Sequence, residues 1–497
     1  MKMVKSLLLG SAAGLIAVAG AQAADLPVKA KPVQYVKICS LYGVGFYYVP
    51  GTDMCIKVGG WARFETGYGY NGSFTTEWWN NNLNNRSTND NPWRVKGVAS
   101  FDARDNTEYG TVRSYITLGI STNINGDDGA QTANYANRWF IQWAGFTIGH
   151  STSFFDFYSV GGNQYGFVSA NSDTGDGGWD VLAYTAQFGN GLSATLSAEQ
   201  QRRTKIVNVG IAPATGFFEA SPGSGGALLP LAAWTTPSGY EGHDYPDLVA
   251  NLRVDQGWGS AQIMGALHNV AAQYYTTTEG GGHPSDKMGF ALGAGILLKA
   301  PMIGMGDYFQ AEVDYTEGAS RYSNATALVG DYVIYHGNTI GYGINSDAVF
   351  GPVASVGSGA LQLTTSWNVA AAYTHNWNAA WKSTLWGSYM AMSYNSTANA
   401  LLCGGVAQVT AGCGNNWDIW GGGLRTEWAV SSNFQIGLEV LYARLDTATP
   451  VGGTITQSGA NGTKAGCTVG AAGSACYAAS DQDQFAVRLR VNRNFYP

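Results

Sequence analysis

The last fifteen residues, Asp483–Pro497, read DQFAVRLRVNRNFYP. Apolar side chains occupy every second position of Phe485–Val491, and the positions between them carry Ala486, Arg488 and Arg490. Successive side chains of a β-strand point to opposite faces, so this strand has one apolar face and one basic face. A soluble protein would bury the apolar face in a core, whereas a membrane barrel would turn it to lipid and the arginines to a watery lumen.

The same alternation recurs through most of the chain and favours the membrane barrel. Period-two segments bounded by Gly, Asn and Asp clusters are typical of strands. We expect sixteen of them, at 56–68, 93–101, 111–120, 138–143, 146–150, 179–188, 192–201, 245–255, 260–269, 287–299, 308–317, 367–375, 381–392, 418–429, 434–445 and 484–495. An even number of this size leaves an aqueous channel when the strands close. The prediction is an all-β, sixteen-stranded antiparallel transmembrane β-barrel over residues 56–497.

The connections between these segments alternate between short and long. Antiparallel strands that cross a membrane are joined by tight turns on the periplasmic side and by long loops outside. The long connections are 71–91, 121–137, 152–178, 202–243, 318–365, 393–416 and 447–482. We expect the third of them, 152–178, to fold inward, because a lumen of this size needs something to narrow it. The alternative is an ordinary surface loop.

The start of the chain predicts export. Lys2 and Lys5 precede a short apolar run that ends at the A-x-A site Ala21-Gln22-Ala23, which is typical of a secretory signal over residues 1–23. Residues 24–55 form an extended, Pro- and Lys-rich lead followed by an aromatic segment between two cysteines. After residue 23 no run is apolar for the roughly 18 residues that a spanning helix needs. The predicted location is the bacterial outer membrane.

Six cysteines in an exported chain suggest disulfides, although six cysteines allow 15 connectivities. We favour pairing between nearest neighbours: Cys39–Cys55, Cys403–Cys413 and Cys467–Cys476. A zinc site is a poor alternative, since no C-x-x-C spacing occurs and no histidine sits beside a cysteine pair.

Motifs at both ends and near residue 150 add a family resemblance. They are Asp25-Leu26-Pro27, the Cys39–Cys55 block with Pro50-Gly51-Thr52-Asp53, Phe140–Phe146, Ser153–Asp156 and the closing RVNRNF. They resemble the corresponding parts of the alphaproteobacterial outer-membrane porins. The resemblance implies a homotrimeric general diffusion porin, with sixteen strands and an inward third loop, that meets membrane lipid, lipopolysaccharide and small hydrophilic solutes and ions. One departure is Pro497, which follows the aromatic residues where such porins usually end.

The functional prediction concerns charges in the lumen. If the last strand pairs beside the first, eight basic residues share the lumen phase on contiguous strands: Lys57, Arg63, Arg94, Lys96, Arg113, Arg138, Arg488 and Arg490. Acidic residues are expected opposite them: Glu312 and Asp314 on a strand, and Asp156, Asp173 and Asp176 in the third loop. Separated walls of opposite charge would set up a field across the pore. The alternative is that these charges only keep water in the barrel.

Catalytic patterns are missing from the sequence. It contains no H-E-x-x-H, G-x-S-x-G or P-loop motif, and its six histidines are scattered. We therefore expect neither an enzyme nor a cofactor, metal or nucleic-acid partner; the Gly/Asp-rich turn 173–178 lacks the remaining pattern of a calcium loop. The favoured function is passive diffusion through a water-filled channel. Alternatives are a substrate-specific channel for a sugar or an anion, a barrel hydrolase and a secreted adhesin.

Overall fold

The computed structural model describes residues 37–70, 91–124, 131–166, 168, 171–209, 239–275, 279–324, 331–336, 339–351, 359–403, 412–450, 453–458 and 474–495. The proposed signal 1–23, Cys467 and the final Tyr496-Pro497 lie outside these ranges. The predictions that concern them remain predictions.

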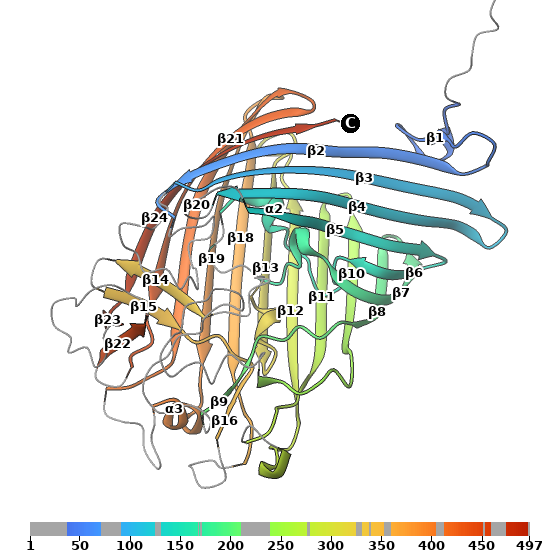
Figure 1. Ribbon diagram of the computed structural model, residues 1–497. Coiled ribbons are helices and arrows are strands. Elements are labelled where there is room, and N and C mark those ends of the chain that lie inside the picture. The colour runs from blue at the N-terminus through green and yellow to red at the C-terminus, as the bar shows by residue number, and fades with distance from the viewer. Residues whose placement is uncertain are drawn as a thin grey trace, which may run out of the picture.

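Sixteen long strands, together with the two-residue β1 (Tyr47–Tyr48), form one antiparallel sheet. They are β2 (Cys55–Tyr68), β3 (Trp93–Thr107), β4 (Gly110–Ile124), β5 (Gln131–Trp143), β6 (Phe146–Ser151), β7 (Trp179–Gly189), β8 (Leu192–Glu199), β10 (Asp247–Gln256), β11 (Gly259–Val270), β12 (Lys287–Lys299), β13 (Tyr308–Glu317), β18 (Thr365–Asn376), β19 (Trp381–Ser393), β20 (Trp417–Ser431), β21 (Phe434–Asp446) and β24 (Gln482–Asn494). Each pairs with the next along the chain, and β24 pairs with β2 (Figure 1). The sheet therefore closes into a barrel without a free edge, as membrane-spanning strands require, which confirms the predicted architecture.

The remaining elements are short and lie in the connections. They are η1 (Ser40–Tyr42), α2 (Val160–Asn163), η2 (Gly175–Gly177), β9 (Ile206–Asn208), η5 (Glu279–Gly281), η6 (Ser320–Tyr322), β14 (Tyr332–His336), β15 (Thr339–Gly343), β16 (Ala348–Phe350), β17 (Gln362–Leu363), α3 (Ser396–Leu402), β22 (Thr454–Ser458) and β23 (Ser474–Ala479). The small strands make two further sheets, β14-β15-β23-β22 and β17-β16-β9. In the part of the chain that the structure describes, no helix is long and apolar enough to span a membrane.

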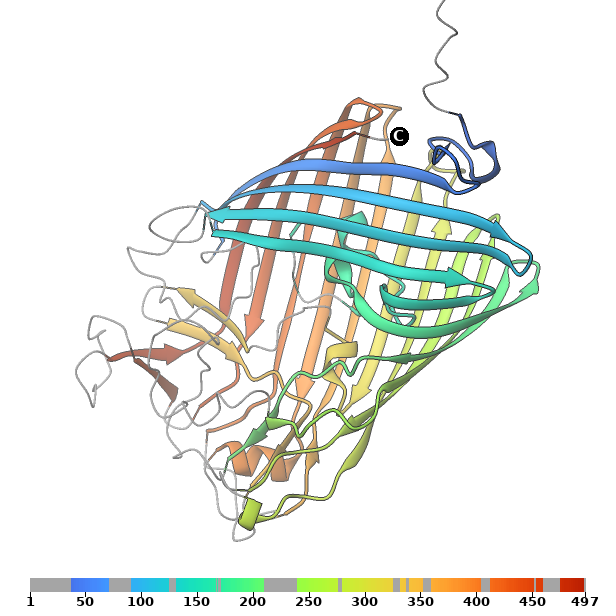
Figure 2. The same cartoon turned by 45° about the vertical axis from the view of Figure 1, so that its right-hand side comes forward.

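The short and the long connections lie at opposite ends of the barrel, as predicted. The bounds of the connection predicted at 121–137 differ from the prediction. Short turns lie at the end of the barrel that carries β1, and long connections lie at the other end (Figures 1 and 2). Residues 121–137, expected to be a long loop, are mostly strand: β4 runs to Ile124, β5 begins at Gln131, and Thr122 pairs with Thr132. These Ser/Thr/Asn-rich segments look like loop in isolation, but threonine fits a paired strand well.

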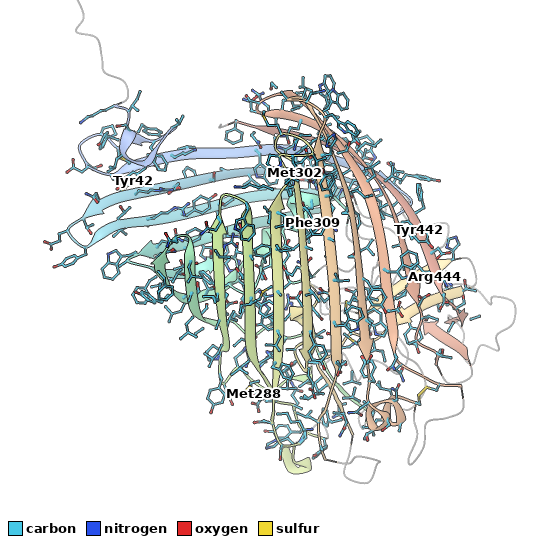
Figure 3. The ribbon with its side chains drawn as sticks, turned by 180° about the vertical axis from the view of Figure 1, so that it is seen from behind. Tyr42, Met288, Met302, Phe309, Tyr442 and Arg444 are labelled. Atoms are coloured by element: carbon cyan, nitrogen blue, oxygen red, sulfur yellow. A yellow bond between two sulfur atoms is a disulfide. The ribbon has the colours of Figure 1, made fainter. Side chains whose placement is uncertain are left out.

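The two faces of the barrel differ as the alternation predicts. On β24, Phe485 is 60% exposed, whereas Arg488 is 2% exposed. Exposed apolar side chains continue around the outside, and Met288 and Met302 lie at opposite ends of the β12 hairpin in Figure 3. An apolar outer face with polar residues inside is the arrangement of a membrane-spanning barrel.

Two of the three expected disulfides are formed, Cys39–Cys55 and Cys403–Cys413. The first ties the segment before β2 to the start of that strand, where Phe46 packs beside both cysteines. The second lies in the connection between β19 and β20, at the end of α3. The pair Cys467–Cys476 remains a prediction because Cys467 is outside the described residues.

Candidate pore constriction

The third long loop, 152–178, contacts polar side chains of the barrel strands. Along each strand these side chains alternate with the exposed apolar side chains of the outer face. Near its start, the Phe154 carbonyl accepts a hydrogen bond from Asn251 of β10 at 2.6 Å. The Tyr158 N–H donates to Glu312 of β13 at 2.5 Å. Glu312 is 1% exposed, whereas its neighbour Val313 is 46% exposed on the opposite face. The loop therefore lies against the polar face.

The middle of the loop is held by charged residues of β20, β21 and β24. The Tyr165 N–H donates to Glu439 at 2.7 Å, and the Tyr165 hydroxyl donates to Glu427 at 2.7 Å. Arg488 donates to the Tyr165 carbonyl, and the guanidinium carbon of Arg490 lies 3.8 Å from the centre of the Tyr165 ring. A methyl group at Gly437 would collide with the Tyr165 hydroxyl, so this close approach requires glycine.

Two of the predicted loop acids stabilise the loop itself. The side chain of Asp156 is 4% exposed and pairs with Arg202 at 2.7 Å, and it also accepts from the Thr174 N–H at 2.7 Å. Burial raises the pKa of Asp156, but the charge of Arg202 and the hydrogen bonds from Thr174 outweigh it and hold that pKa below its usual value. Asp173 accepts from the Val160 N–H at 2.9 Å. The side chain of Asp176 lies outside the described part of the structure.

Glu312 and Asp314 of β13 are covered by this loop. In addition to the contact of Glu312 with Tyr158, Asp314 accepts from the Ser172 N–H at 3.2 Å and from Asn368 at 3.2 Å. Both carboxyl groups are buried. The expected arrangement, in which these acids face the basic residues across open water, is therefore not what the contacts show, because the loop uses them as anchors.

The basic residues gather around an acid that the sequence interpretation did not include in the site, Glu65 of β2. Its carboxylate lies 2.6 Å from Arg94, 2.7 Å from Arg488 and 2.7 Å from Arg490. Glu65 is 0% exposed. The alternation along β2 could have shown from the sequence that Glu65 faces the lumen. Its partners, however, depend on barrel closure, because the strand register places Glu65 opposite Arg94 of β3 and opposite Arg490 of β24.

A second carboxylate, Asp102, organises the neighbouring strands. It lies 3.0 Å from Arg113 and 2.8 Å from Arg104, and Arg113 also donates to Gln142 at 2.8 Å. Arg104 was likewise missed, and it shares the phase of Arg94 on β3.

The remaining predicted basic residues lie on the same face of the barrel wall. Arg63 donates to Asn492 at 3.1 Å and lies 4.2 Å from the Trp61 ring centre. Arg138 donates to the Gly175 carbonyl of the third loop at 2.6 Å. Lys57 and Lys96 follow the same alternation on β2 and β3. Closure thus places the eight on the inner face of neighbouring strands, with Arg94, Arg488 and Arg490 brought to one acid, Glu65.

A cavity of about 460 Å³ lies beside the start of the third loop. Its walls include Arg104, Arg113, Gln142 and Phe154. Just beyond it, Tyr115 and Phe140 stack with ring centres 5.3 Å apart, and Arg113 lies 5.0 Å from the first ring and 5.3 Å from the second.

A closed barrel with an apolar outside, a charged inside and a loop seated on the polar face defines a channel of the bacterial outer membrane. Residues 25–471 match the family described as the Porin subfamily. The chain belongs to this family and is an outer-membrane porin, a channel and not an enzyme.

Curated relatives and a solved structure agree with this assignment. The chain is 30% identical to Porin Omp2b of Brucella suis over 291 residues, covering 56% of this chain and 69% of that protein. It is 30% identical over 296 residues to Porin Omp2b of Brucella melitensis biotype 1, with the same coverage of 56% and 69%. The outer-membrane channel DcaP of Acinetobacter baumannii shares the fold, with a TM-score of 0.53 at 13% identity over 90% of this chain and 99% of that one.

Proposed function

We propose that this porin lets small hydrophilic solutes and ions diffuse passively across the outer membrane, through a lumen that the third loop narrows. The contact between Tyr165 and Glu439 carries the proposal. The loop leaves the barrel at β6 and is anchored on β21, which lies well around the barrel in the order of strands. In this proposal the loop occupies part of the lumen, since it contacts distant parts of the polar inner wall, and it thereby reduces the open cross-section.

In this proposal, the selectivity for solutes and ions depends on the width of the pore and on the charge of the side chains that line it. Arg94, Arg104 and Arg113 keep roughly a fifth to a quarter of their side chains exposed, at 20%, 27% and 26%. Their partners Glu65 and Asp102 neutralise only part of this charge, since each acid is shared by at least two arginines. The surplus favours anions near this wall. Salt screens the effect over a Debye length of about 8 Å at physiological ionic strength.

Deleting Gly161–Asp173 is expected to raise single-channel conductance in planar bilayers, because it removes the part of the loop that reaches Glu439. The deletion joins Val160 to Thr174, and the Val160 N–H already lies 2.9 Å from the carboxylate of Asp173, the residue before Thr174. Heat-modifiable migration in gels identifies correctly assembled barrels. Unchanged conductance in assembled channels would mean that the loop does not form the constriction.

Replacing Arg94, Arg113 and Arg138 together by glutamine is expected to shift the reversal potential in asymmetric salt toward cation preference, most strongly at low ionic strength. Arg444→Gln, which removes one charge from the outer face, is the control and is compared with each single lumen substitution. Arg444 lies on the outer face of β21 beside Tyr442 (Figure 3) and pairs with Asp446 at 2.7 Å. A shift of equal size in Arg444→Gln and in the single lumen variants would show that the lumen position of the charge is irrelevant.

A substrate-specific channel for a sugar or an anion is the second candidate. The stacked Tyr115–Phe140 pair beneath Arg113 favours it, because an aromatic face beside a guanidinium suits a ligand with an apolar face and polar or anionic groups. Saturable block of ion current by one solute class, lost in Tyr115→Ala, would support this candidate over general diffusion. The family resemblance also implies a homotrimer embedded in lipid and lipopolysaccharide, which chemical cross-linking tests.

A further inference from the structure

The inner face of the barrel wall is mostly polar, but its part along β18–β24 carries apolar side chains. Such side chains are unusual on a surface that borders water. On β19, Trp386, Met390 and Met392 share the phase of Thr384 and Ser388, opposite to the exposed Leu385. The neighbouring strands continue this apolar area. Its members are Ala370 and Ala372 on β18, Trp417 and Ile419 on β20, Leu441, Ala443 and Leu445 on β21, and Ala486 on β24, all buried. Burial of these inward-facing residues requires a cover.

The hairpin of β14 and β15, which belongs to the long connection between β13 and β18, covers the part of this area around Trp417, Met390 and Leu445. Its Val333, Ile334 and Ile340 are buried in the same core as the apolar wall. The Tyr332 ring lies 4.7 Å from the ring of Trp417. Figures 1 and 2 show β14 and β15 beside β20, β21 and β24, and contacts link β15 to all three strands.

Hydrogen bonds attach the second half of the hairpin to the wall. The Ile344 carbonyl accepts from the Trp417 indole at 2.7 Å and from the Tyr394 hydroxyl at 2.7 Å. The Tyr342 carbonyl accepts from the Ala448 N–H at 2.9 Å. A methyl group at Gly343 would collide with the Trp417 ring, so the backbone of the hairpin lies directly on the wall.

The third loop contacts the same wall as the hairpin, and the connection beyond the hairpin is braced by further hydrogen bonds. Val168 of the third loop belongs to the same apolar core, and its carbonyl accepts from Ser388 of β19. Beyond the hairpin, the buried Asp347 accepts from the Thr204 N–H at 2.7 Å and from the Tyr240 hydroxyl at 2.8 Å. Both inward segments thus occupy neighbouring parts of the same wall.

We propose that the β14–β15 hairpin is a second inward-folded element that fills the lumen along β18–β24. Solutes then pass along the opposite side, which β2–β10 line with Arg94, Arg104 and Arg113, so the hairpin determines which charges a solute meets. The proposal rests on the channel function proposed above. It adds a specificity-determining element that is separate from the third loop.

The first test measures access and not current. Met390 is 0% exposed under the hairpin. In the full-length protein, Met390→Cys is expected to resist a water-soluble maleimide. It should react at least tenfold faster when residues 332–343 are replaced by a short Gly-Ser linker. The described residues of this range, 332–336 and 339–343, do not pair within the barrel sheet, so the barrel can close without them. Thr185→Cys, in the wall of the open cavity, should label equally in both backgrounds.

The second test is conductance in planar bilayers. The linker variant is expected to conduct about 1.5-fold more than wild type, in proportion to the cross-section that is freed. Gly343→Val should move in the same direction, because a side chain there prevents the hairpin from seating on Trp417. Gly280→Val is the control, since Gly280 has open space around it in another loop.

The outcomes separate the two proposals. Rapid labelling of Met390→Cys in the otherwise intact channel, or unchanged conductance in the assembled linker variant, overturns the hairpin proposal. Wild-type protein that assembles but conducts no ions would instead overturn the channel function on which it rests.

Discussion

Glu65→Gln is expected to lower the free energy of unfolding by about 3 kcal/mol, because removing one partner from a buried ion pair leaves charge without compensation. Three guanidinium groups lie within 2.7 Å of the Glu65 carboxylate. Glutamine keeps the shape of the side chain but removes its negative charge, so Arg94, Arg488 and Arg490 would repel one another. The effect lies at the low end for buried pairs, since Arg94 remains 20% exposed to water that can solvate it.

Denaturant unfolding in lipid vesicles measures this loss. Glu108→Gln changes the net charge by the same amount in the exposed β3–β4 turn and is expected to have little effect. Equal stability of the two variants would show that Glu65 does not hold the arginines together. In assembled channels, Glu65→Gln should also increase anion preference, because the wall gains one unit of positive charge.

Leu489→Arg is expected to cost about 2–4 kcal/mol of barrel stability, because it turns a charged side chain toward the lipid near mid-membrane. Leu489 pairs with Leu438 of β21, which is exposed on the outer face, and with Thr66 of β2. Its neighbour Arg488 points the other way, to Glu65. A charged side chain is therefore expected to be tolerated at position 488 but not at the adjacent position 489 of the same strand.

Unfolding in vesicles and gel mobility measure assembly of the Leu489→Arg variant, with Leu489→Met as the conservative control. Arg488→Leu should assemble and mainly alter conduction, since Glu65 keeps Arg94 and Arg490. If Leu489→Arg assembled as well as wild type while Arg488→Leu failed, the assignment of the two faces would be reversed.

The alternation of side chains was sufficient to predict the sixteen strands, their two faces and their closure. A period of two is a local property, so Arg488 and Leu489 could be assigned to opposite faces without knowing any neighbour. The pairing of Cys39 with Cys55 was similarly local, as was that of Cys403 with Cys413. Local composition misled at strand boundaries, since β3 runs to Thr107 and Ser, Thr and Asn extend the end of β4 and the start of β5, and it did not predict the small strands within the long connections.

Only the tertiary structure decided which charges meet and what lies inside the barrel. Glu65 meets Arg490 because the register of β2 on β24 joins residues from the two ends of the chain. Asp156 pairs with Arg202, 46 positions later in the chain, which was not among the predicted basic residues. The apolar side chains of Trp386 and Met390 on the inner face broke the expected pattern because another segment covers them. Cross-strand register and loop path depend on contacts between distant residues, and a local pattern does not contain that information.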